Sequence, residues 1–506
     1  MIICILALSF LLRVYKLDSK PVWYDEAVSI AHAEKPLDFY FTSPRVNYKP
    51  VYFLLLKSWV SVFGEEAFPL RGFSLIWGLL SIGLIYKLGK ELFDARAGLF
   101  SAFLLSISVF HIYHCQQIRQ FSLMVFLTLL SCLYFIKFIK KSRIYYLFIV
   151  TLANIILINT HPYGLYVCLF EIIFALLFLP KGARKSWIYS QVFLSMFILF
   201  WLALPNKEHI KELLFWIQRP NFYSLMETID TFSWGGVRYG LDDFKIRSAL
   251  LGPVKLLSYV NLALLLFGLL VKTKYDNKRI FFLFLWLVIP ISISFLLSRI
   301  SGYSIYAIKH LIIVLPAFYI IIGRGLCHLK RSLKIIALAI ILFLNILPLK
   351  VMYNNYFCTD WQKSAEYVKG LAKENEAVIV STLHEVVPFI YYFKEKRPSL
   401  QDMDIYGKIG DNGYENVFFV DKNILIAGIT QHGFGGGKDA SYDFKRNVID
   451  NPNLKHKNIW AIFSRWTRPK DKGAFLSYLD SNYIRIDSKE FQGTDVFYFK
   501  QTGIRE

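Results

Sequence analysis

Residues 280–298 read IFFLFLWLVIPISISFLLS and carry no charge. An α-helix needs about 20 apolar residues to cross the hydrocarbon core of a bilayer. A run of this length and composition is typical of a membrane-spanning helix and is rare in a water-soluble domain. The stretch therefore predicts that the chain is inserted in a membrane.

The rest of the chain supports this prediction. Of its 506 residues, 55% are hydrophobic and only 19% are charged, against about 25% in soluble domains. The mean hydropathy is +0.41. The first apolar run begins at Met1 without a basic n-region, so we do not expect a signal peptide. By length, the apolar runs predict about eleven transmembrane helices, at about 1–12, 72–86, 97–113, 120–136, 144–160, 162–180, 187–205, 256–271, 280–298, 305–323 and 335–349.

The loops between these runs alternate in charge. Every second loop is short and basic, which is the pattern of cytoplasmic loops. We therefore expect the other loops, including 13–71, 206–255 and everything after 350, on the outer face of the cytoplasmic membrane. This pattern accounts for the net charge of +21 without a nucleic-acid partner. The basic loops contain Lys87, Lys90 and Arg96; Lys137, Lys140, Lys141 and Arg143; Lys181, Arg184 and Lys185; Lys272, Lys274, Lys278 and Arg279; and Arg324, Lys330, Arg331 and Lys334.

Residues 351–506 form the only large polar region. Residues 360–374 have helical spacing, and 377–383, 416–420, 423–429 and 458–464 resemble strands, with a closing hairpin over 483–499. We predict a membrane domain over 1–350 and a small extracytoplasmic α/β domain over 351–506. The glycine-rich segment 432–438 lacks the spacing of a P-loop and is expected to be a loop. The six cysteines contain no CxxC pair, which argues against a metal knuckle or a disulfide framework.

The first external loop contains two adjacent carboxylates, Asp25 and Glu26, next to Tyr24, and further along Tyr52. These residues fit a reactive site at the membrane surface. A solvated loop with an aromatic belt is the alternative.

The second external turn, from His111 to Phe121, is dense in polar residues and includes His114, Gln117 and Arg119. Such residues in a membrane protein face a cavity or one another. His111 and His114 lie three apart and could share a metal ion, but no third ligand is evident. No cofactor is certain, and a divalent metal stays an alternative.

Cations stand near the external ends of several runs. Guanidinium groups suit phosphate because they bind two oxygens at once. Cations beside a carboxylate fit a reaction in which the cations hold a lipid-linked phosphate and the carboxylate activates an acceptor. Snorkelling to lipid headgroups is the alternative for each of them. Glu171 lies inside an apolar run, so it should face the bundle and find a partner there. It could make a structural hydrogen bond between helices or have a functional role. The cations are Arg71, Arg119, Arg299 and Lys309, with His310 beside them.

These motifs resemble the GT-C glycosyltransferases, in particular bacterial relatives of the dolichyl-phosphate-mannose protein mannosyltransferases and of the lipid A aminoarabinose transferases. Asp25-Glu26 is similar to the acidic pair of their first external loop, and Tyr48-Lys-Pro-Val-Tyr52 to their Pro-Pro-Leu-Tyr segment. The segment 114–121 resembles their Ser-Gln-Glu-Ala-Arg-x-Tyr, with Gln117 in place of Glu. Residues 308–316 resemble Arg-Tyr-Leu-x-x-x-x-Pro, with Lys309-His310 in place of Arg-Tyr. Residues 360–367 resemble Asp-Trp-Arg-x-x-Ala-x-Tyr, with Gln362 in place of Arg.

The resemblance implies a hexosyl or pentosyl transferase that takes its sugar from a polyprenyl-phosphate donor and inverts the anomeric centre. Asp25 would be the base or would orient the acceptor, and Glu26 would support it. Arg119 and Lys309 would hold the carrier phosphate, with Arg71 and Arg299 as further candidates. The substrate pocket would contain Tyr24, Tyr52, His111, His114, Gln117 and His310.

The partners would be the lipid-linked donor, membrane lipids, and a glycan, lipid or protein acceptor. Two other functions remain. A flippase for lipid-linked glycans would fit the membrane helices, although no internal repeat is evident. A non-catalytic glycan-binding relative would fit Gln117, which cannot act as a base.

Overall fold

The chain divides into two compact units in the computed structural model. One contains residues 1–17 and 37–355, and the other contains 18–36 and 356–506. We call them the membrane unit and the second unit. The segments Asn47–Lys49 and 432–438 lie outside the described residues. The structure describes residues 1–42, 50–203, 217–236, 244–271, 277–354, 359–374, 376–381, 385–393, 409–410, 413–414, 418–421, 424–429, 457–465, 467 and 469–501.

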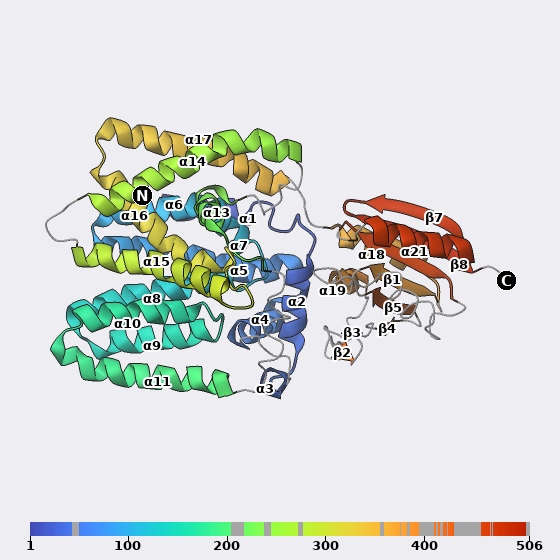
Figure 1. Cartoon of the computed structure of the whole chain (residues 1–506), viewed down its shortest axis with the longest axis horizontal. Helices are drawn as coiled ribbons and strands as arrows, with labels where there is room; N and C mark the ends of the chain where they lie inside the picture. The colour runs from blue at the N-terminus through green and yellow to red at the C-terminus, as the bar shows by residue number, and fades with distance from the viewer. Residues whose placement is uncertain are drawn as a thin grey trace. The chain divides into compact units, whose positions relative to one another are not determined.

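The described part of the membrane unit is helical (Figure 1). Helices α8, α9, α10 and α11 pack side by side, and α14 packs against α16 and α17. Its elements are α1 (Ile2–Val14), α3 (Phe39–Thr42), α4 (Pro50–Phe63), α5 (Ala67–Leu92), α6 (Ala95–Ile107), α7 (Val109–Cys115), α8 (Phe121–Lys141), α9 (Ile144–Ile158), α10 (Gly164–Phe178), η1 (Lys181–Ala183), α11 (Arg184–Ala203), α13 (Phe222–Trp234), α14 (Phe244–Leu270), α15 (Asn277–Ile300), η2 (His310–Val314), α16 (Leu315–His328) and α17 (Arg331–Asn354).

The structure supports a membrane protein with several spanning helices, but it does not confirm the predicted count of eleven. Among the described residues, six helices are long and apolar enough to cross a bilayer, or seven if the bent pair α6–α7 forms one span. Each predicted run does overlap a helix. However, α1, α9 and α10 have only 13 to 15 residues, and a helix rises about 1.5 Å per residue. These three helices are therefore shorter than a hydrocarbon core of about 30 Å.

Contacts inside the membrane unit join loops of the same predicted side. Lys140 forms an ion pair with Glu91 at 2.7 Å, and both belong to predicted cytoplasmic loops. At the opposite helix ends, the Val51 amide donates to the Asn159 carbonyl at 3.2 Å. The hydroxyl of Tyr163 also donates to the Ile305 carbonyl. The predicted external segments therefore meet at one end of the unit.

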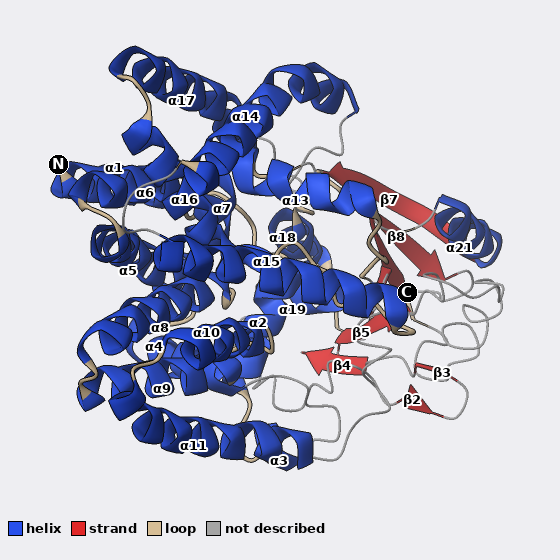
Figure 2. Ribbon diagram, turned by 60° about the vertical axis from the view of Figure 1, so that its left-hand side comes forward, coloured by secondary structure: helices blue, strands red, loops and turns tan. Residues whose placement is uncertain are grey.

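The second unit combines helices with a six-stranded sheet in the order β4-β5-β1-β6-β8-β7 (Figure 2). Strand β1 is parallel to β5 and β6, and the other pairs are antiparallel. The elements are α2 (Tyr24–Glu34), α18 (Trp361–Leu371), β1 (Ala377–Ser381), α19 (Val386–Phe393), β2 (Ile409–Gly410), β3 (Gly413–Tyr414), β4 (Phe418–Asp421), β5 (Ile424–Ile429), β6 (Ile459–Ser464), α21 (Pro469–Asn482), β7 (Tyr483–Phe491) and β8 (Thr494–Gln501).

The core of this sheet follows from the alternation of side chains along its strands. Ile379, Ala461 and Phe499 lie on one face and pack against Phe475 and Leu479 of α21. The hairpin of β7 and β8 turns at Gly493, whose φ of +76° is costly for other residues. The predicted strands and hairpin thus coincide with β1, β4–β8. The placement of this unit outside the cell stays a prediction.

A buried carboxyl group makes the second unit sensitive to pH. Glu385 is 9% exposed and lies against Trp361 and Arg465. Burial raises the pKa of Glu385 from 4.5 to about 7, although a hydrogen bond with Trp361 and the charge of Arg465 oppose the rise. The unfolded chain therefore loses its proton first as pH rises, and folding becomes less favourable between pH 4.5 and 7, with the full cost above pH 7.

We expect Glu385→Gln to remove this cost, which is at most about 3 kcal/mol. The difference in unfolding free energy between the variant and the wild type should therefore increase from pH 5 to pH 8, in favour of the variant. Denaturant unfolding of the full chain, followed by tryptophan fluorescence at both pH values, measures the effect. Glu366→Gln, at an exposed position of α18, is the matched control. An equal response of the two variants to pH would contradict the prediction.

Candidate functional site

A break between α6 and α7 shapes the predicted external end of the membrane unit. The two helices meet at Ser108 with a bend of 62°. A bend takes the last carbonyls of a helix away from the amides that would otherwise pair with them. Arg13 of α1 supplies donors at this break, because its guanidinium donates to the carbonyls of Ser106 at 2.9 Å and Leu105 at 3.1 Å. Arg13 is completely buried.

His111, a predicted pocket residue, belongs to this same network. Its Nδ1 lies 2.8 Å from an Arg13 nitrogen. A guanidinium only donates hydrogen bonds, so Nδ1 accepts and the proton of the neutral ring is on Nε2. His111 is 0% exposed. The histidine therefore stabilises the break between the helices, a role that its place in the sequence did not predict.

Among the described residues, the structure brings no third metal ligand to His111 and His114. His114 is buried among the rings of Phe110, Tyr113 and Phe121. In the described ranges, no group of three or more His, Cys, Asp or Glu side chains could hold a metal ion.

Arg119, Lys309 and His310 come together at the ends of different helices, and we call them the cation cluster. Arg119 precedes α8, and its guanidinium lies 5.9 Å from the centre of the Phe121 ring. The Phe121 ring in turn stacks on His310 at 6.1 Å. Lys309 directly precedes His310 in the chain.

The turns that hold the cation cluster are fixed by hydrogen bonds. Ser74 of α5 donates to the Arg119 carbonyl at 3.3 Å. Lys309 precedes the 3-10 turn η2, in which Leu311 to Val314 are buried. Arg119 and Lys309 are themselves half-buried. The cluster thus combines a fixed backbone with side chains that solvent reaches.

The two further phosphate candidates lie in different surroundings. Arg71 is 1% exposed and donates to the Leu17 carbonyl at 3.0 Å, so it holds the backbone where the chain leaves α1. Arg299 is exposed at the last turn of α15. Gln117 is 7% exposed, and Tyr52 is 1% exposed against Phe73.

The acidic pair starts helix α2 of the second unit. Glu26 is 1% exposed, and its Oε2 accepts from the Trp23 amide at 3.4 Å, which is one half of a capping box. Asp25 and Tyr24 are half-buried. Two residues before α2, the backbone amide of Val22 donates to the hydroxyl of Tyr392 in α19 at 2.5 Å.

Asp25 and the cation cluster thus belong to different units, and their pairing stays a prediction. Glu26 has a clear local task in fixing the start of α2.

Two residues of these networks were not predicted from the sequence. His161 follows α9, and its ring centre lies 4.5 Å from that of His310. A polar Asn-Thr-His turn between two apolar runs was the available signal. Arg13 was also visible as a charge at the end of the first apolar run, where its cost predicts a buried partner.

Glu171 has the partners that a buried carboxyl group needs. Ser131 of α8 and Asn154 of α9 each donate to it at 2.7 Å. The group therefore links α8, α9 and α10 inside the bundle.

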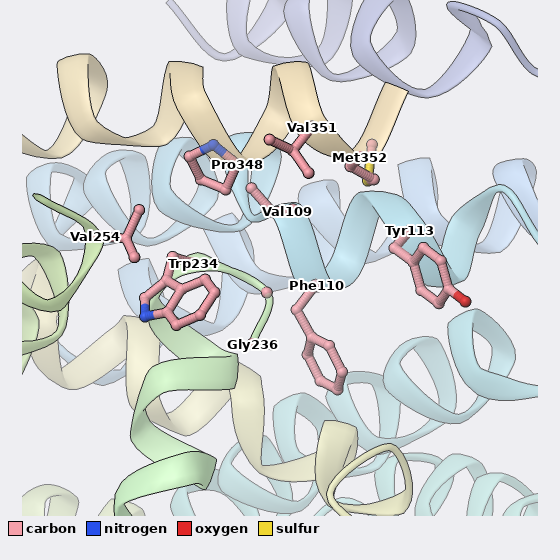
Figure 3. Close-up of a pocket in the computed structure, with 10 residues that line it drawn as sticks. Val109, Phe110, Tyr113, Trp234, Gly236, Val254, Pro348, Val351 and Met352 are labelled. Carbon is pink, nitrogen blue, oxygen red and sulfur yellow. The ribbon is translucent and has the colours of Figure 1, made fainter. Parts of the chain in front are cut away.

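A small pocket lies beside α7, lined by apolar side chains of α13, α14 and α17 as well (Figure 3). Phe110, Trp234, Val254 and Met352 are among its walls. Its lining contains no residue of the cation cluster.

Comparison with known proteins identifies the fold. Residues 44–206 match the family model of the dolichyl-phosphate-mannose-protein mannosyltransferases. No curated protein matches the sequence.

Solved structures match almost the whole chain. ArnT from Cupriavidus metallidurans in the apo state is 11% identical, with 98% of this chain and 97% of that chain covered and a TM-score of 0.60. The structure of the same protein bound to undecaprenyl phosphate is also 11% identical, with the same coverage and a TM-score of 0.54.

The archaeal oligosaccharyltransferase AglB from Archaeoglobus fulgidus, in complex with an inhibitory peptide and a dolichol-phosphate, is 12% identical. All of this chain and 75% of that chain are covered, with a TM-score of 0.52. The chain therefore has the fold of the GT-C glycosyltransferases and resembles the protein mannosyltransferases and ArnT among them.

Proposed function

We propose that the protein is a membrane glycosyltransferase that moves a sugar from a polyprenyl-phosphate donor to an acceptor on the outer face of the cytoplasmic membrane. The acceptor is a lipid, a cell-envelope glycan or a protein. The observation that carries this proposal is the cation cluster, in which Arg119 and the Lys309-His310 pair come from two distant parts of the chain and the Phe121 ring contacts both Arg119 and His310.

The cluster suits a lipid-linked phosphate for electrostatic and geometric reasons. Arg119 offers a planar fork of donors and Lys309 a mobile point charge. Both precede the start of a helix in the membrane unit, at the end where the predicted external turns meet. Solved proteins of the same fold bind undecaprenyl phosphate and dolichol-phosphate, which supports this class of ligand.

The proposed chemistry is a direct displacement at the anomeric carbon. The acceptor nucleophile forms the new glycosidic bond as the bond to the carrier phosphate breaks. Asp25 takes the proton of the acceptor, and the cation cluster stabilises the negative charge that develops on the departing phosphate. Proton removal from the acceptor and stabilisation of the departing phosphate belong to the same displacement step.

Binding of the carrier alone tests the donor half of this proposal. We expect Arg119→Gln to weaken binding of undecaprenyl phosphate by about tenfold to a hundredfold, because a hydrogen bond to a charged group is lost. The dissociation constant is measured with the full chain in nanodiscs. Arg143→Gln is the matched control, since Arg143 is exposed before α9 in a predicted cytoplasmic loop. Equal affinities of wild type and Arg119→Gln would contradict this role of Arg119.

Turnover then separates the proposal from its alternatives. The wild type is given a panel of undecaprenyl-phosphate sugars with lipid, glycan and peptide acceptors. Sugar transfer with release of undecaprenyl phosphate supports an enzyme. Carrier binding without transfer to any acceptor favours a glycan-binding relative, and movement of labelled donor across proteoliposomes without an acceptor favours a flippase.

A further inference from the structure

His161 lies beside the cation cluster, in a turn that the proposed chemistry does not yet use. The residue follows α9 and precedes α10, and it is 9% exposed. Its ring centre is 4.5 Å from that of His310 and 5.3 Å from that of Tyr163.

Local backbone geometry fixes the tautomer of His161. The Tyr163 amide donates to Nδ1 of His161 at 3.1 Å, across the intervening Pro162. An Nδ1 that accepts a hydrogen bond carries no proton, so the proton of the neutral ring is on Nε2. The same bond orients the ring. The ring of His161 is therefore neutral, with its proton on Nε2.

The surroundings of His161 favour this neutral form. His310 stands against it, with Lys309 and Arg119 close to His310. A further positive charge beside Arg119 and Lys309 would be repelled. The site thus contains two permanent cations and a donor without charge.

We propose that His161 is a further donor-site residue, whose Nε2–H group donates a hydrogen bond to the carrier phosphate next to Arg119 and Lys309. This inference rests on the proposed function, because it assigns His161 to the same phosphate site. The ligand class is a lipid phosphate, either the phosphodiester of the donor or the phosphomonoester that leaves.

Two variants distinguish this role from a purely structural one. In His161→Asn, the side-chain oxygen can accept the Tyr163 amide in an Asx-turn, but the Nε2 donor is removed. In His161→Gln, the longer amide carries an N–H group to about the position of Nε2. A phosphate donor is therefore lost in the Asn variant and replaced in the Gln variant.

The test measures the dissociation constant of undecaprenyl phosphate for the full chain in nanodiscs. We expect His161→Asn to bind at least about tenfold more weakly and His161→Gln to recover most of the loss. Wild-type affinity in His161→Asn, or equally weak binding in both variants, would overturn the proposal. His328→Asn is the matched control, because His328 is the last residue of α16, at the end of that helix away from His310.

Two further measurements keep the result interpretable. Thermal unfolding without ligand shows whether each variant folds. If His161→Asn fails to fold, His161→Ser replaces it, because a serine hydroxyl can also accept the Tyr163 amide. If the wild type itself binds undecaprenyl phosphate no better than undecaprenol, the proposed function fails rather than the role of His161.

Discussion

Replacing Asp25 with asparagine is expected to lower the rate of sugar transfer by about 10²–10⁴-fold, the usual contribution of a general base. Asparagine has nearly the same shape but cannot take a proton. Asp25 is half-buried in the first turn of α2, and its carbonyl accepts from the Ser29 hydroxyl at 2.8 Å. This backbone bond is unaffected by the substitution, so the variant should fold.

Two controls define the result for Asp25. Asp18→Asn, at an exposed position before α2, should transfer sugar at the wild-type rate. Undecaprenyl phosphate should bind Asp25→Asn as it binds the wild type, because the cation cluster is unchanged. The initial rate of transfer at saturating donor is the measurement. An Asp25→Asn protein that transfers sugar at the wild-type rate would remove Asp25 as the base.

Replacing Arg13 with methionine is expected to destabilise the membrane unit by at least about 3 kcal/mol. Methionine fills a similar volume but donates no hydrogen bond. The carbonyls of Leu105 and Ser106 and the Nδ1 of His111 would each lose a donor in a buried position. Each such loss costs about 1–3 kcal/mol.

Thermal unfolding in detergent measures this effect, together with the yield of monodisperse protein. Arg13→Lys should recover only part of the stability, since an ammonium group cannot reproduce the fork that reaches two carbonyls and a ring nitrogen. Arg184→Met, at an exposed position of α11, should unfold as the wild type does. A wild-type unfolding temperature for Arg13→Met would show that the break between α6 and α7 is stable without its cation.

The sequence predicted the helices of the membrane unit well because the signal for each is local. A charge-free run such as 280–298 needs no knowledge of its neighbours, and it appears as α15. The count of spans was harder to predict. The bend at Ser108 and the short helices α9 and α10 depend on packing against other segments, which hydropathy does not report.

The candidate site shows the same limit. Arg119, Lys309 and His310 were predicted from their positions at run ends. The Phe121 ring contacts both Arg119 and His310, and their role in phosphate binding stays a prediction. The role of His111 depends on Arg13, which is 98 residues away along the chain. His161 and His310 meet from turns that are even farther apart in sequence. Such pairs cannot be predicted without the fold, because periodicity and spacing give information about one helix at a time.

Helix α2 packs against α19, although the two are separated by more than three hundred residues of chain. During translation, the proposed base emerges from the ribosome early, and its supporting helix is made near the end. A nascent chain that has only inserted its first helices therefore lacks a rigid support for Asp25. A truncated product would accordingly be unable to transfer sugar from the donor, so activity would begin only when synthesis is complete.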